Sequence, residues 1–171
     1  MRICLAVLLA ALFTPYAIGA DLPIGTMRFA LGTDQSGVMQ EARTRFHVVP
    51  LQGSPDMYFL SETKPPNVRI LGAIRFANGR LVWAQRNWGQ FEGKVTSTDV
   101  SKTMFAAIES AAAAAGTSAT VSTKIQHIPG AEFKSIYFDF PGRKITITST
   151  DGDASRGGKQ ISIEESIGLT R

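Results

Sequence analysis

The chain contains only one cysteine, Cys4, among its 171 residues. Residues 5–171 therefore have no cysteine for a disulfide, a catalytic thiol or a metal site. No asparagine begins an Asn-X-Ser/Thr acceptor for glycosylation, which argues against eukaryotic secretion. The sequence therefore predicts a disulfide-free fold that is held together by the burial of apolar side chains.

Long apolar runs and runs of like charge are also missing from most of the chain. After residue 20, no segment reaches the roughly 20 consecutive apolar residues that a membrane-spanning helix needs. The 18 Lys and Arg residues are spread along the chain, and the formal net charge is +4. Such mild, dispersed charge does not favour nucleic-acid binding, although it permits weak attraction to anionic envelope polymers.

The first 20 residues carry a pattern typical of an export signal. A basic second residue precedes the uncharged apolar run Leu5–Phe13, and small residues end the segment at Ala20. Pro15 stops the run too early for a membrane anchor. We expect cleavage near Ala20–Asp21 and a location in the bacterial periplasm or the extracellular medium. Removal of this signal leaves 151 of the 171 residues, a normal size for one domain.

Apolar periodicity predicts one α+β domain over residues 34–171, after a lead-in segment of residues 21–33. The Asn78–Gly79 pair predicts a tight hairpin turn, because both residues tolerate positive φ angles. Residues 35–45 fit a helical and an alternating pattern, of which the helix is favoured. We expect antiparallel strands packed by one or two helices. The predicted helices cover 35–45 and 99–115 (N-cap Thr98), and the strands cover 46–50, 57–61, 68–77, 80–88, 119–128, 133–140, 144–150 and 160–164.

Two hairpin segments resemble each other. Residues 74–80 read IRFANGR, and residues 136–143 read IYFDFPGR. They indicate two repeated units, over 34–95 and 96–171, each with a helix and three or four strands. Any two hairpins share apolar alternation and a glycine turn, so the sequence supports coincidence equally well.

The predicted Asn-Gly turn fixes which side chains share a face of the hairpin. It places Phe76 opposite Leu81 and Ile74 opposite Trp83, so that these four residues point toward the core. We expect Asp139 opposite Lys144 in the later hairpin. The predicted core is Ile74, Phe76, Trp83, Met104, Ile108, Ile136, Phe138 and Ile147.

The other face of the first hairpin is the best candidate for binding. It is predicted to carry Arg69, Arg75, Arg86 and Trp88, with no acidic residue among them. Arginines and an aromatic ring around an apolar strip suit a protein partner or an anionic envelope polymer. The alternative is that a loop or the lead-in segment covers this face.

Catalytic and cofactor motifs are absent from the sequence. The Gly-X-Ser-X-Gly pattern does not occur, and His47 and His127 have no metal-ligand partner at suitable spacing. No metal or cofactor is predicted. The favoured hypothesis is a non-catalytic binding module of the bacterial cell envelope. The alternatives are a small secreted or periplasmic hydrolase built around His47 or His127, and a structural accessory that forms a dimer.

Overall fold

The computed structural model describes residues 20–62, 68–93, 96–152 and 158–168. The predicted export signal lies outside the described residues except for Ala20, so cleavage there stays a prediction. None of the helices within these ranges is long and apolar enough to cross a membrane. The elements in chain order are β1 (Asp21–Ile24), β2 (Met27–Ala30), α1 (Gln35–Arg45), β3 (His47–Leu51), β4 (Ser54–Ser61), β5 (Ile70–Ala77), β6 (Arg80–Glu92), α2 (Ser97–Ala115), β7 (Thr120–Ile128), β8 (Ala131–Phe140), β9 (Arg143–Gly152) and β10 (Lys159–Gly168).

The α+β prediction is confirmed. Eight strands form one antiparallel sheet in the order β3-β4-β5-β6-β10-β9-β8-β7, and β1 and β2 form a separate hairpin. Each helix is followed by four strands, and the last strands of the two series, β6 and β10, pair at the centre of the sheet. We call the α1–β6 portion the α1 half and the α2–β10 portion the α2 half. An origin of the repeats 34–95 and 96–171 by duplication stays a prediction.

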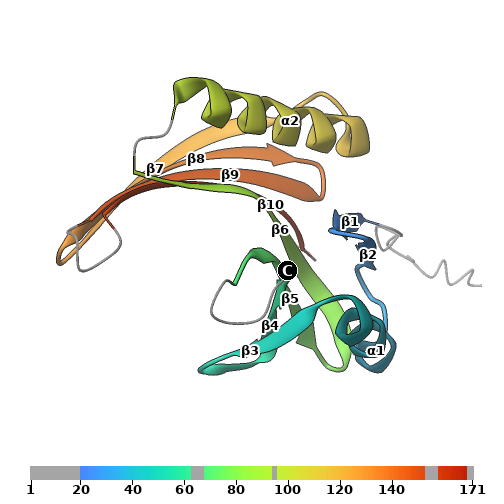
Figure 1. Cartoon of the computed structure of the whole chain (residues 1–171). Helices are drawn as coiled ribbons and strands as arrows, with labels where there is room; N and C mark the ends of the chain where they lie inside the picture. Colours follow the sequence, from blue (N-terminus) through green and yellow to red (C-terminus); the bar gives the residue numbers. More distant parts are fainter. Residues whose placement is uncertain (1–19, 63–67, 94–95, 153–157, 169–171) are drawn as a thin grey trace, which may run out of the picture.

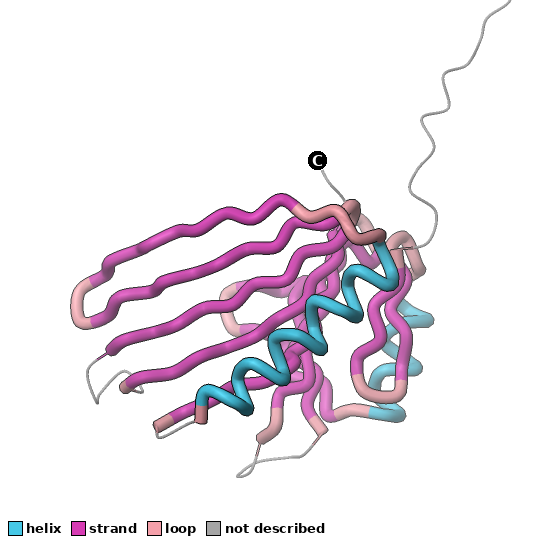
Figure 2. The backbone as a smooth tube through the Cα atoms, turned by 90° about the horizontal axis from the view of Figure 1, so that it is seen from above, coloured by secondary structure: helices cyan, strands magenta, loops and turns pink. Residues whose placement is uncertain are grey.

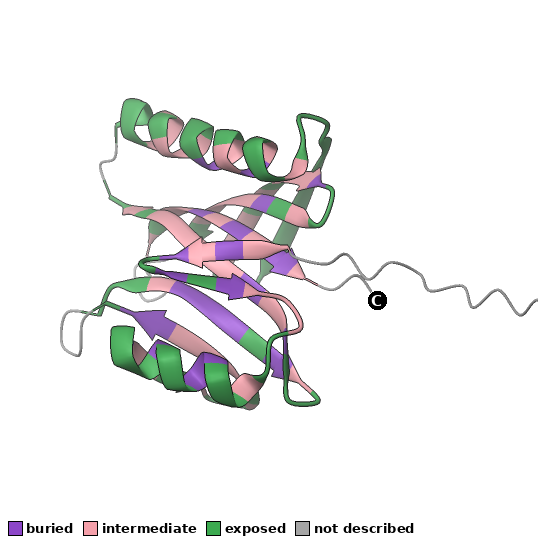
Figure 3. Cartoon of the chain, turned by 90° about the vertical axis from the view of Figure 1, so that its right-hand side faces the viewer, coloured by how far each residue is buried: buried purple, intermediate pink, exposed green. Residues whose placement is uncertain are grey.

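Both helices lie on the same side of a sheet that bends through its centre (Figure 1). In that view α2 lies above the upper strands, α1 lies to the right of the lower strands, and the β1–β2 hairpin lies between them. Figure 3, seen from the side of α1 and the β1–β2 hairpin, shows buried positions where these elements meet the sheet. The sheet surface without helices therefore lines the inside of the bend.

The lead-in segment is part of the core and not a simple approach to the domain. Four side chains of the β1–β2 hairpin are buried against α1 and the first strands. Gly72 in β5 permits this close contact, because a Cβ there would lie 2.2 Å from the Gln85 carbonyl oxygen and 3.0 Å from Ile24. The buried members of this α1-half core include Leu22, Ile24, Phe29, Val38, Met39, Ala42, Phe46, Leu60, Ile74, Phe76 and Leu81.

The α2 half has a smaller core. Ala107 and Ala111 are fully buried against the sheet, as small residues allow a helix to approach closely. Met104, Ile108, Phe138 and Ile147 pack around them, as predicted. The helix begins two residues earlier than expected, because the Thr96 hydroxyl accepts the N-cap hydrogen bond from the Asp99 amide. The prediction that Ile136 is in the core is wrong, since it is among the exposed residues.

The predicted hairpin turn is correct, but its register changes two residues later. Asn78 and Gly79 have φ angles of 51° and 71°, and Phe76 lies opposite Leu81. A β-bulge then leaves Val82 unpaired and brings Trp83 opposite Arg75, whereas Ile74 lies opposite Ala84. The expected Ile74–Trp83 pair is therefore wrong. The second strand of the hairpin is also longer than the predicted 80–88, because β6 continues to Glu92.

Candidate functional site

The surface inside the bend, which we call the helix-free face, is the candidate site. Its residues alternate along each strand with the residues that point toward α1, α2 and the hairpin. Most of its central positions are half-buried, and hydroxyl, amide and aromatic side chains predominate. The members used below are Met57, Arg75, Trp83, Gln85, Tyr137, Asp139, Lys144, Thr146, Glu164 and Ser166.

Trp83 is on the helix-free face because of the bulge in β6. It pairs with the exposed Arg75, while the neighbouring pair of Ile74 and Ala84 is buried on the helix side. Trp83 is in neither hydrophobic cluster of the described residues, although it is half-buried. Its prediction as a core residue is therefore wrong. An indole in this position contributes little to either core and can contact a ligand.

Two hollows lie on either side of the Arg75–Trp83 pair. The first is lined by Trp83 and by parts of β8, β9 and β10, including Lys144 and Ser166. The second is lined by Arg75 and by parts of β4 and β5, including Met57. An aromatic ring and an arginine between two hollows resemble the anchors that dominate protein–protein interfaces.

Charged and aromatic side chains continue the surface on β8 and β9. Asp139 lies opposite Lys144, as predicted, and the two side chains form an ion pair with a separation of 3.0 Å. The Lys144 ammonium also lies 5.4 Å from the centre of the Tyr137 ring. These contacts hold the Lys144 side chain beside the first hollow, where 46% of its surface is exposed.

Glu164 lies at the centre of the bend. Its neighbours across the strands are Asn87 of β6 and Thr146 of β9. Burial raises the pKa of this carboxyl above its usual value, and a hydrogen bond with Gln85 opposes the shift in part. The carboxylate is thus a partly desolvated acceptor on the helix-free face, where a donor from a partner would satisfy it.

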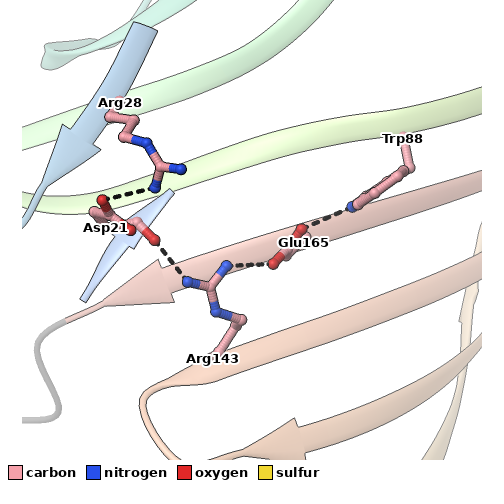
Figure 4. A network of polar contacts seen from close by, with 5 residues as sticks. All are labelled: Asp21, Arg28, Trp88, Arg143 and Glu165. Carbon is pink, nitrogen blue, oxygen red and sulfur yellow. Dashed lines mark hydrogen bonds and ion pairs between the residues drawn. The ribbon is translucent and has the colours of Figure 1, made fainter. Parts of the chain in front are cut away.

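The opposite side of β10 holds a buried polar network, shown in Figure 4. Glu165 is fully buried; its Oε2 accepts a hydrogen bond of 2.8 Å from Trp88 Nε1, and Arg143 forms an ion pair with Oε1. Arg143 Nη2 also donates to the Asp21 carbonyl oxygen at 2.6 Å. This network joins β1, β6, β9 and β10, so it stabilises the junction between the two halves.

The four predicted binding residues are divided between different surroundings. Arg75 is exposed on the helix-free face, and Arg69 is exposed just before β5, where it forms an ion pair with Glu62. Arg86 and Trp88 point to the helix side because of the bulges at Val82 and Trp88. The prediction that both point outward on one face with Arg69 and Arg75 is wrong.

A cation–π contact joins Arg86 to the buried network. The Arg86 guanidinium lies over the Trp88 ring, at 3.7 Å from its centre. Burial lowers the pKa of the Arg86 guanidinium, and the nearby Glu165 carboxylate opposes this shift. Arg86 therefore extends the buried network, and sequence reasoning missed that Trp83, not Trp88, lies on the helix-free face.

The two histidines lie in different halves. His47 begins β3, and its carbonyl oxygen accepts a hydrogen bond from the Ser61 hydroxyl. His127 Nδ1 lies 3.2 Å from Glu132 near the tip of the β7–β8 hairpin. Neither histidine lines the two hollows beside Trp83. In the described part of the chain, no three His, Cys, Asp or Glu side chains group to hold a metal.

Comparisons with protein-family models, curated proteins and solved structures find no match to this chain. The site must therefore be interpreted from its own chemistry. The helix-free face offers an aromatic ring, an arginine, a partly buried carboxyl and hydroxyl groups on an antiparallel sheet. This arrangement is suited to recognition by contact and hydrogen bonding.

Proposed function

We propose that this protein is a non-catalytic binding module of the bacterial cell envelope that contacts a protein partner through its helix-free face. The location rests on the export signal predicted from residues 1–20. The observation that carries the proposal is the position of Trp83, half-buried outside both cores and between two hollows. Tryptophan and arginine are the side chains that most often dominate binding energy at protein interfaces.

The chemistry of the face favours a protein over a polymer of uniform charge. Arg75 and Lys144 are positive, but Asp139 and the partly desolvated Glu164 lie on the same surface. A mixed surface can match a protein that presents both donors and acceptors, whereas an anionic polymer would be repelled by the two carboxylates. An anionic envelope polymer remains the second candidate because the chain carries a net charge of +4.

Capture from an envelope extract by the immobilised full chain tests the proposal. The test variants are Trp83→Ala and Arg75→Glu, and the matched control is Arg43→Glu, which makes the same charge reversal on the exposed side of α1. We expect one protein to be retained by the wild type and the control, and to bind at least about tenfold more weakly to both test variants.

The same experiment separates the two kinds of partner. A protein partner should be lost with Trp83→Ala even at low salt, whereas polymer binding should respond to Arg75→Glu and to added salt alone. Equal capture by the wild type and both test variants would contradict the proposal. The thermal midpoint of each variant is measured in parallel, so that loss of binding is not confused with loss of folding.

A further inference from the structure

The edge strand β7 is exposed along its whole length. All nine of its residues are exposed, it contains no proline, and its only charged side chain apart from a histidine is Lys124. Natural sheets usually block such edges with prolines, bulges or short strands, because free N–H and C=O groups recruit other strands. The opposite edge follows that rule: β3 has five residues, contains Pro50 and is irregular there.

Apolar side chains line the same edge on the side that faces α2. Val121, Ile125 and Ile136, which we call the apolar strip, are 58%, 60% and 41% exposed. Val121 lies opposite Phe138 of β8, which packs beneath α2, so the two side chains share this side of the sheet. Ile125 is four residues from Val121 on β7 and Ile136 is two residues from Phe138 on β8, so both point to the same side. Viewed from above, α2 crosses the sheet obliquely and leaves the far edge bare (Figure 2).

Phe105 adds to this surface from the flank of α2. A Cβ on Gly89 of β6 would lie 3.3 Å from Thr103, so that flank of the helix faces β6. Two residues further on, an α-helix has turned by about 200°. Phe105, which is 58% exposed, therefore projects from the flank that faces away from β6, toward the β7 edge.

We propose that β7 pairs in antiparallel fashion with β7 of a second copy of this chain, with Thr123 opposite Thr123 across a two-fold axis. Both copies then keep their α2 helices on the same side of a continuous sheet. Val121 of each copy lies opposite Ile125 of the other, and the two apolar strips meet. Apolar side chains that are exposed in one copy are thereby buried together.

The sequence of β7 favours this register over its neighbours. Pairing about Thr123 sets Lys124 opposite Ser122, so no like charges meet. A register centred on Lys124 would place the two ammonium groups directly opposite each other, which is destabilising, and Val121 opposite His127. A shift by an odd number of residues would place each apolar strip beside polar side chains and separate the two α2 helices onto opposite surfaces.

The same geometry limits the assembly to two chains. A two-fold pairing uses the β7 edge of both copies, and the edges that remain are the two β3 strands with Pro50. A closed pair is the usual outcome when one self-complementary edge is available. This pairing uses a surface separate from the helix-free face. The proposed dimer and the proposed partner binding can therefore be tested independently.

Two measurements on the full chain test the proposal. Light scattering should give twice the chain mass of 18.4 kDa for the wild type and one chain mass for Ile125→Lys. The control Val49→Lys, a similar change on the β3 edge, should remain a dimer. Circular dichroism checks that both variants are folded.

Cross-linking tests the register directly, in a Cys4→Ser background that leaves no other cysteine. Thr123→Cys should form an intermolecular disulfide under mild oxidation, because the two Cα atoms lie within bonding range. Thr120→Cys should not, because its two copies would lie about 20 Å apart along the strands. A monomeric wild type, a dimer that survives Ile125→Lys, or equal cross-linking at both positions would overturn the proposal.

Discussion

The sheet of the α1 half is well covered on its helix side, whereas the sheet of the α2 half is covered only in part. In the α1 half a hairpin covers the space beside the helix, and the outer strand is short and contains Pro50. In the α2 half a single alanine-rich helix covers part of the sheet, and β7 remains exposed. The same order of one helix and four strands thus ends in a protected edge strand in the α1 half and in an exposed edge strand in the α2 half.

The difference arises from side-chain volume. The α1-half core contains three phenylalanines, and the ring centres of two of them, Phe29 and Phe46, lie 6.4 Å apart. The helix of the α2 half buries only two alanines completely. A small core is sufficient there because β10 pairs with β6 and the buried network joins the halves.

The largest expected effect compares the two cores. Phe76→Ala removes a fully buried ring from the α1 half and should lower the free energy of unfolding by about 3–5 kcal/mol. Met104→Ala, at a half-buried position of the α2 half, should cost about 2 kcal/mol or less. Denaturant unfolding of both variants measures this, and equal losses would remove the contrast between the halves.

The second prediction concerns the junction. Glu165→Leu leaves the Arg143 guanidinium and the Trp88 N–H without their buried acceptor, and should cost about 3–5 kcal/mol. The double variant Glu165→Leu/Arg143→Met should recover part of that loss, because no buried charge is left unpaired. Calorimetry or denaturant unfolding gives both values.

Glu62→Leu is the matched control for the junction. It removes the carboxylate of an exposed ion pair with Arg69, and such pairs contribute about 0–1 kcal/mol. If it proves as costly as Glu165→Leu, burial of the network is not what stabilises the junction.

The smallest expected effect is a pH dependence on the helix-free face. Because burial raises the pKa of Glu164 in the folded protein, ionisation favours the unfolded state. Glu164→Gln should therefore raise the thermal midpoint at pH 7, where the carboxyl is ionised in the unfolded state. The difference should disappear as the pH falls below about 4.3, where the carboxyl is protonated in both states. If the midpoints of the wild type and Glu164→Gln differ by the same amount at pH 7 and below about pH 4.3, the raised pKa of Glu164 is contradicted.

Local signals predicted the elements well. The helix at 35–45, the Asn78–Gly79 turn and the Asp139–Lys144 pair are all confirmed. Each depends on a few neighbouring residues, such as a cap, a turn pair or opposite charges across a hairpin. These features can be inferred from sequence because their physical causes are local.

The candidate site could not be predicted in the same way. The bulges at Val82 and Trp88 move Trp83 outward and Arg86 and Trp88 inward, and neither bulge interrupts the apolar alternation visibly. The hydrogen bond of Trp88 on the helix side depends on Glu165, which lies 77 positions away in the chain. Exposure of Ile136 depends on how far α2 reaches across the sheet. Such outcomes follow from tertiary packing.

The paired variants Trp83→Ala and Trp88→Ala test the central claim most directly, because the two indoles differ by five positions on one strand but have opposite roles. Trp88 is half-buried like Trp83, but it packs against the α2-half core and donates to the buried Glu165. We therefore expect Trp88→Ala to lower the free energy of unfolding by about 3 kcal/mol. Trp83→Ala should cost less than half as much, yet weaken partner capture at least about tenfold at a temperature where it is fully folded. Capture that survives Trp83→Ala, or greater destabilisation by Trp83→Ala than by Trp88→Ala, would contradict the account.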